Sequence, residues 1–116
     1  MNGGQMISNG RPYEIMIQKR GDAVADDSGF ETETWTDFYT NFAYINSLTG
    51  TERWMAEQAG ADRTLKFVLR WHPQLDEVRP KYYRIIFAGR IFTITFVDNV
   101  QYKNETVRID ALEVEA

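Results

Sequence analysis

The carboxylates between residues 20 and 33 are the densest group of side chains in this chain that could carry out chemistry. Asp22, Asp26 and Asp27 lie close together there, and loops rich in carboxylate oxygens bind calcium. A calcium loop places its acids in a D-x-D-x-D-G register closed by a bidentate glutamate, and this segment lacks that register. We therefore expect no metal site and interpret residues 20–33 as a solvated acidic loop that turns at Ser28-Gly29.

His72 is the only histidine, so it is the other residue that could act as a base or a ligand. A catalytic base needs a positioned partner, and none is recognisable beside it, so we interpret His72 as a surface residue at a strand end. The sequence also has no cysteine, no phosphate-binding glycine loop, no nucleophile elbow and no H-E-x-x-H pair. We expect a protein that is not an enzyme and uses no cofactor.

The length of 116 residues predicts a single domain. We place it at residues 13–116, after a flexible N-terminal arm at residues 1–12 that lacks the basic and apolar parts of a signal peptide. No run approaches the roughly 18 apolar residues that cross a bilayer, so we expect no membrane contact. The net charge of −4 argues against a protein that grips nucleic acid by neutralising phosphates. It leaves open a surface past which DNA moves without sticking.

The stretch 82–97 predicts the β-hairpin around which the rest of the chain is organised. Two runs rich in β-branched and aromatic residues, Tyr82–Phe87 and Ile91–Val97, face each other across a short turn. Gly89 supplies the positive φ that such a turn needs. Alternate residues of the second run are expected to share one buried face: Phe92, Ile94 and Phe96.

Period-two alternation predicts further strands at 13–19, 34–39, 42–45, 65–72 and 106–114. Segments 34–39 and 42–45 fit either two short strands or one long strand bent near Asn41, and we expect a bulge near Ala111 in the last strand. With roughly five to seven strands, one short helix and long loops, the sequence predicts a mainly β fold, either a small antiparallel barrel or a sandwich.

A single short helix is predicted at residues 51–59, which contain mostly strong helix formers. Thr49 or Thr51 would cap its amino end and Gly60 would end it. Glu52 suits the first turn, and we expect its side chain to remain in solvent.

Aromatic residues make up 14% of the chain, which is more than so small an interior holds easily. Some of the rings must therefore lie at the surface. Two interpretations remain open: isolated rings that neighbouring side chains half cover, or rings that form subunit interfaces, where aromatic residues are enriched.

Six short motifs follow one another along residues 13–114: Ile15-Met16-Ile17-Gln18; Asp27-Ser28-Gly29 with Trp35; Phe42-Ala43-Tyr44-Ile45; Thr49-Gly50-Thr51-Glu52; Leu69-Arg70-Trp71; and the run from Arg84 to Ile94 that contains Gly89-Arg90. In this order and spacing they resemble the head–tail adaptor, or head-completion, proteins of tailed bacteriophages. The chain departs from that pattern at Phe42, where the family often has Trp, and at Ser47, where it often has Pro.

The resemblance implies a β-barrel subunit that forms a homo-oligomeric ring beneath the portal and joins the DNA-filled head to the tail. Its partners would be the portal, or connector, protein and a tail-completion protein. In some members such a ring closes the DNA channel, and double-stranded DNA passes through without tight binding. The protein would then lie at the head–tail interface of the virion, and in the host cytoplasm during assembly or when expressed from a prophage. A free subunit that is monomeric until it meets the portal is a further hypothesis.

Two groups of residues are candidates for assembly. Residues 44–60 and the acidic loop 20–34 are the segments that core packing explains least, and such loops commonly carry function. They contain the candidate interaction or channel residues Asp22, Asp26, Asp27, Tyr44, Asn46, Thr49, Glu52, Arg53 and Trp54. The resemblance adds candidate framework or interface positions, namely Trp35, Arg70, Arg84, Gly89 and Arg90.

Three other functions compete with this interpretation. A tail-completion protein is the nearest, and copurification with portal rather than tail-tube protein would separate the two. A barrel of the OB type that binds single-stranded nucleic acid needs cations beside its rings, but Lys66 and Arg70 stand isolated in an acidic chain. A small hydrolase lacks any recognisable pairing of nucleophile and base.

Overall fold

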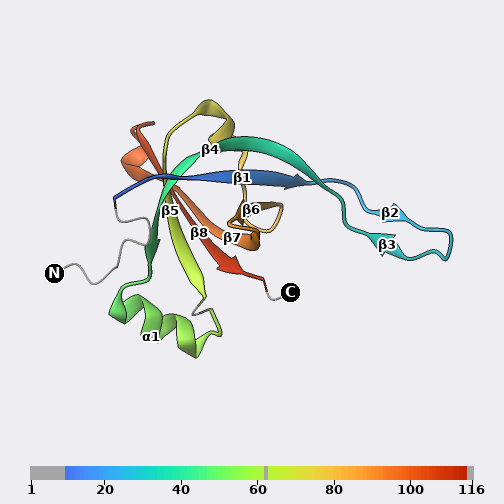
Figure 1. Ribbon diagram of the computed structural model, residues 1–116, viewed down its shortest axis with the longest axis horizontal. Helices are drawn as coiled ribbons and strands as arrows, with labels where there is room; N and C mark the ends of the chain where they lie inside the picture. The colour runs from blue at the N-terminus through green and yellow to red at the C-terminus, as the bar shows by residue number, and fades with distance from the viewer. Residues whose placement is uncertain (1–9, 62, 115–116) are drawn as a thin grey trace.

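The computed structural model describes residues 10–61 and 63–114, so most of the predicted N-terminal arm lies outside the described residues. Six strands close into an antiparallel barrel in the order β1-β4-β5-β8-β7-β6 (Figure 1). They are β1 Tyr13–Arg20, β4 Trp35–Ser47, β5 Thr64–Arg70, β6 Tyr83–Phe87, β7 Arg90–Asn99 and β8 Thr106–Glu113. The predicted mainly β fold is confirmed.

Shorter elements connect the barrel strands. β2 Val24–Ala25 pairs with β3 Glu31–Thr32 inside the acidic loop, and α1 Gly50–Gln58 joins β4 to β5. Two 3-10 helices, η1 Pro73–Glu77 and η2 Val100–Tyr102, lie in later connections. Figure 1 shows the β2–β3 hairpin extending beyond the barrel at one end of the molecule, with α1 towards the other end. Within the described residues, no helix is both long and apolar enough to cross a membrane.

The barrel closes because β1 pairs with β4 on one side and with β6 on the other. Closure removes the free sheet edges that a sandwich of the same strands would keep. Inward-facing apolar side chains fill the interior, and the rings of Phe67 and Phe92 meet edge to face with 5.5 Å between their centroids. The largest fully buried side chains are Phe67, Phe92, Ile15, Ile17, Ile45, Leu75, Ile85, Ile94, Ile109, Val78 and Val107.

The hairpin predicted at 82–97 is confirmed as β6 and β7, with Phe87 paired to Arg90. Only Ala88 and Gly89 lie in the turn, and both have positive φ, at 52° and 74°. Positive φ at both central residues is typical of a type I′ turn, whose twist matches that of the flanking strands. The turn is therefore one residue shorter than the sequence suggested.

The expected burial of Phe96 is wrong, because β7 contains a bulge. Ile94 pairs with Ala111 and Phe96 pairs with Asp110, so Thr95 has no partner of its own. The extra residue shifts the alternation, and Phe96 points outward with 46% of its surface exposed.

The bulge expected near Ala111 is absent, since β8 alternates regularly. Val107, Ile109 and Ala111 are all buried, and Ala111 places a small side chain in the core opposite Ile94. The sequence-based expectation failed because it treated the apolar Leu112 as the residue that faces inward.

β4 is one long strand rather than two, and its bulge lies at Phe38 instead of near Asn41. Ile17 pairs with Tyr39 while Gln18 pairs with Asp37, so Phe38 is the extra residue. The strand bends where its outer half leaves the barrel to join the acidic loop.

The connection before β6 contributes two apolar side chains to the core. Leu75 in η1 and Val78 just after it are each 1% exposed and pack into the barrel core. Leu75 and Val78 stand three residues apart, so one turn of a 3-10 helix points both to the same side.

Candidate assembly surfaces

The acidic loop is a structured hairpin, and we call residues 20–34 the acidic hairpin. At its tip the Asp26 carboxylate accepts hydrogen bonds of 2.9 Å from the backbone N–H groups of both Ser28 and Phe30. Gly29 takes a φ of 84° in the same turn, as predicted for Ser28-Gly29. The Asp26 side chain thus orders the backbone of the hairpin tip, as in an Asx turn. Among the described residues, no group of three or more acidic or histidine side chains is placed to hold a metal.

The base of the acidic hairpin is closed by a tight cross-strand contact. Gly21 donates its backbone N–H to the carbonyl oxygen of Thr34 at 2.8 Å, and the Thr34 hydroxyl donates to the carbonyl oxygen of Asp22 at 2.8 Å. A Cβ at Gly21 would lie 2.6 Å from the Thr34 Oγ1 atom, so a larger residue would force the Thr34 hydroxyl or the hairpin base to move. The side chains of Asp22 and Asp27 are exposed on the hairpin.

Trp35 and Arg84, two of the predicted framework residues, meet where the acidic hairpin joins the barrel. The Arg84 guanidinium carbon lies 4.3 Å from the centre of the Trp35 ring, a cation–π contact. Its Nε donates a 2.8 Å hydrogen bond to Gln18 Oε1, and Gln18 Nε2 donates to Asp37 Oδ1 at 3.0 Å. Partial burial lowers the pKa of Arg84, and the charge of Glu33 opposes that shift. These contacts link β6, β1 and β4 at the root of the hairpin.

A second contact group supports the same root. The carboxylate of Glu77 accepts a 2.7 Å hydrogen bond from the Tyr83 hydroxyl and a 3.0 Å hydrogen bond from Lys19 Nζ. Burial and then the neighbouring carboxylate raise the pKa of Tyr83, so the phenol stays protonated and donates to Glu77. Because Lys19 and Glu77 are about half exposed, the ion pair itself contributes little to stability.

α1 begins and ends one residue before the predicted range 51–59, and Thr49 is the one of the two candidate caps that begins it. Thr49 is the N-cap: its hydroxyl accepts from the backbone N–H of Glu52 at 3.1 Å, and Glu52 Oε1 accepts from the backbone N–H of Thr49 at 2.9 Å. This reciprocal capping box satisfies two backbone donors that the helix would otherwise leave unpaired. Gly60 follows the C-terminus with a φ of 71°.

The expectation that Glu52 stays in solvent is wrong, since its carboxylate fastens α1 to the barrel. Lys66 Nζ on β5 donates to it at 2.7 Å, and Arg108 on β8 lies 3.5 Å from its other oxygen. The hydrogen bond from Lys66, followed by that from the Thr49 backbone, lowers the pKa of Glu52 to about 2. Asp110 also binds Arg108, at 2.9 Å, and raises the pKa of that arginine.

α1 exposes apolar side chains rather than burying them. None of its residues is buried, and Trp54 and Met55 are 64% and 61% exposed. Arg53 is exposed on the same helix. A nine-residue helix with no buried face is held mainly by its cap and by Glu52, and it presents free apolar surface.

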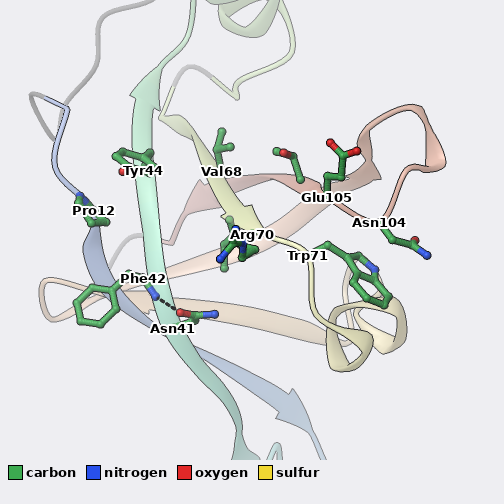
Figure 2. Close-up of a pocket in the computed structure, with 11 residues that line it drawn as sticks. Pro12, Asn41, Phe42, Tyr44, Val68, Arg70, Trp71, Asn104 and Glu105 are labelled. Carbon is green, nitrogen blue, oxygen red and sulfur yellow. Dashed lines mark hydrogen bonds between the residues drawn. The ribbon is translucent and has the colours of Figure 1, made fainter.

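A groove on the outer face of β4, β5 and the start of β8 has a volume of about 840 Å³. Figure 2 shows Arg70 in its middle, with Phe42 and Tyr44 of β4 on one side and Trp71 on the other. Phe42 and Tyr44 are 56% and 42% exposed. Among the described residues, the exposed Arg70 side chain has no hydrogen bond or salt bridge. Val68 pairs with Tyr44 across the strands and lines the groove floor.

Three predicted positions lie outside these contact groups. Gly89 and Arg90 form the β6–β7 turn and the start of β7, and Arg90 makes an exposed 3.7 Å contact with Glu113. Asn46 pairs with Lys66 on the β4–β5 ladder, beside the anchor of α1.

His72 has a structural role as the N-cap of η1. Its Nδ1 accepts a 3.2 Å hydrogen bond from the backbone N–H of Gln74, and the side chain is exposed. The interpretation of His72 as a surface residue at a strand end is confirmed.

The structure therefore separates the predicted interaction residues into two sets. Asp22, Asp26 and Asp27 lie on the acidic hairpin before β4, whereas the others lie in the second half of β4 and in α1 with its N-cap, which follow it. Sequence reasoning missed the groove residues Val68, Trp71, Asn104, Glu105 and Thr106. The alternation in Phe42-Ala43-Tyr44-Ile45 was the signal that could have indicated the groove. Ala43 and Ile45 face the core, so the aromatic Phe42 and Tyr44 must face outward.

Comparison with known families gives one clear match. The model of the phage head completion protein family matches residues 9–115. No curated protein matches this chain.

Two solved structures share the fold. A protein from Shigella flexneri 2a, known from its solution structure, aligns with a TM-score of 0.58 and 24% sequence identity over 97% of this chain and 96% of its own. A chain from the virion of a native gene transfer agent particle aligns with a TM-score of 0.58 and 23% identity over 91% of this chain and 98% of its own. At these identities the alignments establish the fold alone.

Proposed function

This chain belongs to the phage head completion protein family, and from that premise we propose that it forms a ring that joins the portal of the DNA-filled head to the tail. The observation that carries the proposal is the family match, which spans nearly the whole barrel and both candidate surfaces. The role is structural: the chain completes the head at the head–tail junction. The related fold in the virion of a gene transfer agent supports a place in the particle.

The arrangement of exposed surfaces supports a ring. The acidic hairpin lies at one end of β4, and α1 follows the other end (Figure 1). The groove is lined by Phe42 and Tyr44 from the half of β4 that leads to α1. A subunit with two different contact surfaces on opposite sides associates head to tail, and such association closes into a ring when the rotation between subunits fits. The exposed aromatic residues then have a use as interface, where Trp, Tyr and Phe are enriched.

The charge of the acidic hairpin suits a ring through which DNA passes. Asp22, Asp26, Asp27, Glu31 and Glu33 give it a strongly negative surface, with Arg20 paired to Glu33 at 2.9 Å. A negative surface repels the phosphates, so DNA would traverse the ring without being held. Closure of the channel after packaging, as in some members of the resembled family, belongs to the same proposal.

Among the described residues, a single free arginine, Arg70, stands in the groove beside exposed rings, whereas a barrel that binds single-stranded nucleic acid needs a positively charged groove that follows the strand. That function needs free Lys or Arg beside the exposed rings. Lys66 is held by Glu52, which leaves Arg70 as the cation in the middle of the groove.

We propose the portal protein on one face of the ring and a tail-completion protein on the other. The free chain would be monomeric and would assemble on the portal ring. Light scattering of the purified protein alone and with portal tests this step, and a stable ring formed without portal contradicts it.

The test of the proposed function shortens the acidic hairpin. Because Gly21 and Thr34 are hydrogen-bonded partners, residues 22–33 can be replaced by a two-residue Asn-Gly turn. We expect the shortened chain to keep the barrel, as judged by an unchanged thermal unfolding transition, while filled heads and free tails accumulate unjoined. Normal numbers of infectious particles from this variant contradict the proposal.

A matched control keeps the hairpin and changes the opposite side of the barrel. Ile91 on β7 is 37% exposed and lies three strands from β4 in either direction around the barrel. Ile91→Ser should leave joining intact.

A further inference from the structure

The acidic hairpin carries an exposed apolar anchor surrounded by carboxylates. Phe30 is 72% exposed at its tip, and Val24 on the facing strand is 58% exposed. Hydrogen bonds from Ser28 and Phe30 to Asp26 fix the tip backbone, so its presentation of Phe30 is ordered before binding. A rigid aromatic side chain on an ordered turn is the kind of anchor that contributes most to an interface.

The groove offers the complementary chemistry. Phe42, Tyr44 and Trp71 give it aromatic walls, Val68 lies on its floor, and Arg70 stands in its middle without a partner among the described residues (Figure 2). Its volume of about 840 Å³ is within the usual range for pockets that take a small ligand, so a turn bearing one phenylalanine fits. Arginine stacks on aromatic rings and also pairs with carboxylates, which is the combination that the hairpin tip presents.

The acidic hairpin cannot reach the groove of its own subunit. Phe42 follows Trp35 by seven positions on β4, which corresponds to roughly 23 Å along the strand. The hairpin also extends away from the barrel at the Trp35 end, as Figure 1 shows. Gly29 at the tip is five residues from Thr34 at the base, which corresponds to roughly 17 Å of extended strand, enough to bridge to a neighbouring molecule.

We propose that the tip of the acidic hairpin of one subunit docks in the groove of a second copy, with Phe30 against Phe42 and Tyr44 and the hairpin carboxylates facing Arg70. This inference rests on the proposed function, because it assigns the contact between neighbours in the ring. Because the acidic hairpin and the groove are two different surfaces toward opposite ends of β4, their contact between copies is head to tail, the kind that generates rings.

The charges also fix the orientation of docking. Glu105 lines the groove beside Asn104, on the far side of Arg70 from Phe42 (Figure 2). A carboxylate there repels the acidic tip and directs it to the β4 side of the groove. Glu105→Gln should therefore tighten the contact, and Arg70→Glu should weaken it.

Cysteine pairing tests the contact directly, because the chain contains no cysteine. The variant with both Phe30→Cys and Tyr44→Cys is incorporated into particles under reducing conditions and then mildly oxidised. We expect a ladder of covalent dimers and higher multiples on a non-reducing gel. The yield of cross-linked species should be roughly ten times that of a control variant with both Phe30→Cys and Ile91→Cys, since docking raises the local concentration of the paired thiols.

Each outcome separates this inference from the proposed function. Particles that incorporate the double variant but yield no ladder overturn the docking contact and leave the head–tail role intact. Absence of the unsubstituted chain from particles overturns the role, and the docking contact with it. Should Tyr44→Cys prevent folding, Phe30→Cys with Val68→Cys serves as a second pair, with the same ladder expected. A ladder from either single variant alone also contradicts the assignment, because the contact joins two different sites.

Discussion

The guanidinium of Arg84 lies 4.3 Å from the centre of the Trp35 ring, and this contact joins β6 to the first residue of β4. It lies at the point where the acidic hairpin leaves the barrel, and Gln18 on β1 completes it through the hydrogen bond from Arg84 Nε. The hairpin therefore projects from a braced root.

Breaking this root should loosen the hairpin without unfolding the barrel. Trp35→Ala removes the stacked ring, and Arg84→Lys keeps the charge while losing the fork that reaches both Trp35 and Gln18. We expect a coupling free energy of roughly 0.5–1 kcal/mol between the two positions in a double-mutant cycle of chemical denaturation. Additive effects of the two substitutions would show that the stacking contributes nothing. Arg90→Lys, at the exposed β6–β7 turn, is the matched control and should change stability little.

Glu52 predicts a specific loss of stability in acid. Its pKa is about 2 in the folded protein and near the ordinary value of 4.5 in the unfolded chain. A carboxylate with a depressed folded-state pKa stabilises the protein above its unfolded pKa, and that contribution disappears as pH falls from about 4.5 to about 2. A third of the side chain is exposed, so we expect about 1 kcal/mol rather than the full value of the shift.

Glu52→Gln isolates this effect, because glutamine can still close the capping box with Thr49 while it loses the charge that binds Lys66. The wild-type free energy of unfolding should exceed that of Glu52→Gln at pH 6, and the difference should vanish near pH 2. Urea denaturation across this range measures it. A difference that stays constant with pH contradicts the assignment. Glu52→Ala also removes the capping box and should cost about 1 kcal/mol more than Glu52→Gln at every pH.

Local patterns were sufficient for the parts of the fold that neighbouring residues determine. The β6–β7 hairpin needs a positive φ at Gly89, and the start of α1 needs Thr49 and Glu52 three residues apart. Both signals lie within a few residues of the structure they form, so the sequence predicted the hairpin and placed the start of α1 at Thr49 or Thr51, although it did not predict the pairing of Thr49 with Glu52.

The predictions that failed concern features that depend on barrel closure. The bulges at Phe38 and Thr95 arise where β4 and β7 must stay in register with strands distant in the sequence, and no local pattern marks them. The same limit applies to the candidate site, since Trp35 and Arg84 meet only through the barrel. The groove gathers residues from β4, β5 and the start of β8, so spacing along the chain could indicate only its β4 side.

Ala111 provides a test of the β8 register. Its side chain is fully buried opposite Ile94, whereas Leu112 is only partly buried. Ala111→Leu should overpack the barrel and cost roughly 1–3 kcal/mol in thermal or chemical unfolding. Leu112→Ala should cost less, since it removes a side chain that is already partly exposed. The reverse order of the two losses would mean that Leu112, not Ala111, faces the core.

The Gly21–Thr34 contact predicts a substitution that disorders the acidic hairpin alone. In Gly21→Ala the new Cβ would lie 2.6 Å from Thr34 Oγ1, so the Thr34 hydroxyl must leave its hydrogen bond to Asp22 or the hairpin base must open. We expect faster amide exchange at residues 21–34 with a nearly unchanged melting temperature, because the barrel core is untouched.

The second substitution Thr34→Ala removes the clashing oxygen, so the Gly21→Ala/Thr34→Ala variant should regain slow exchange at the amide of residue 21, which donates to the Thr34 carbonyl. Gly29→Ala is the control at the tip, where nothing lies within 4 Å and only the positive φ of 84° opposes a side chain. Its effect should stay local to the tip, since the base contact is untouched, and Thr34→Ala should not reverse it. Equal exchange in Gly21→Ala and the wild type would show that the close approach at the hairpin base is not a constraint on the folded protein. If the acidic hairpin docks on a neighbouring copy, Gly21→Ala should also reduce the cross-linking of Phe30→Cys with Tyr44→Cys, and Thr34→Ala should restore it.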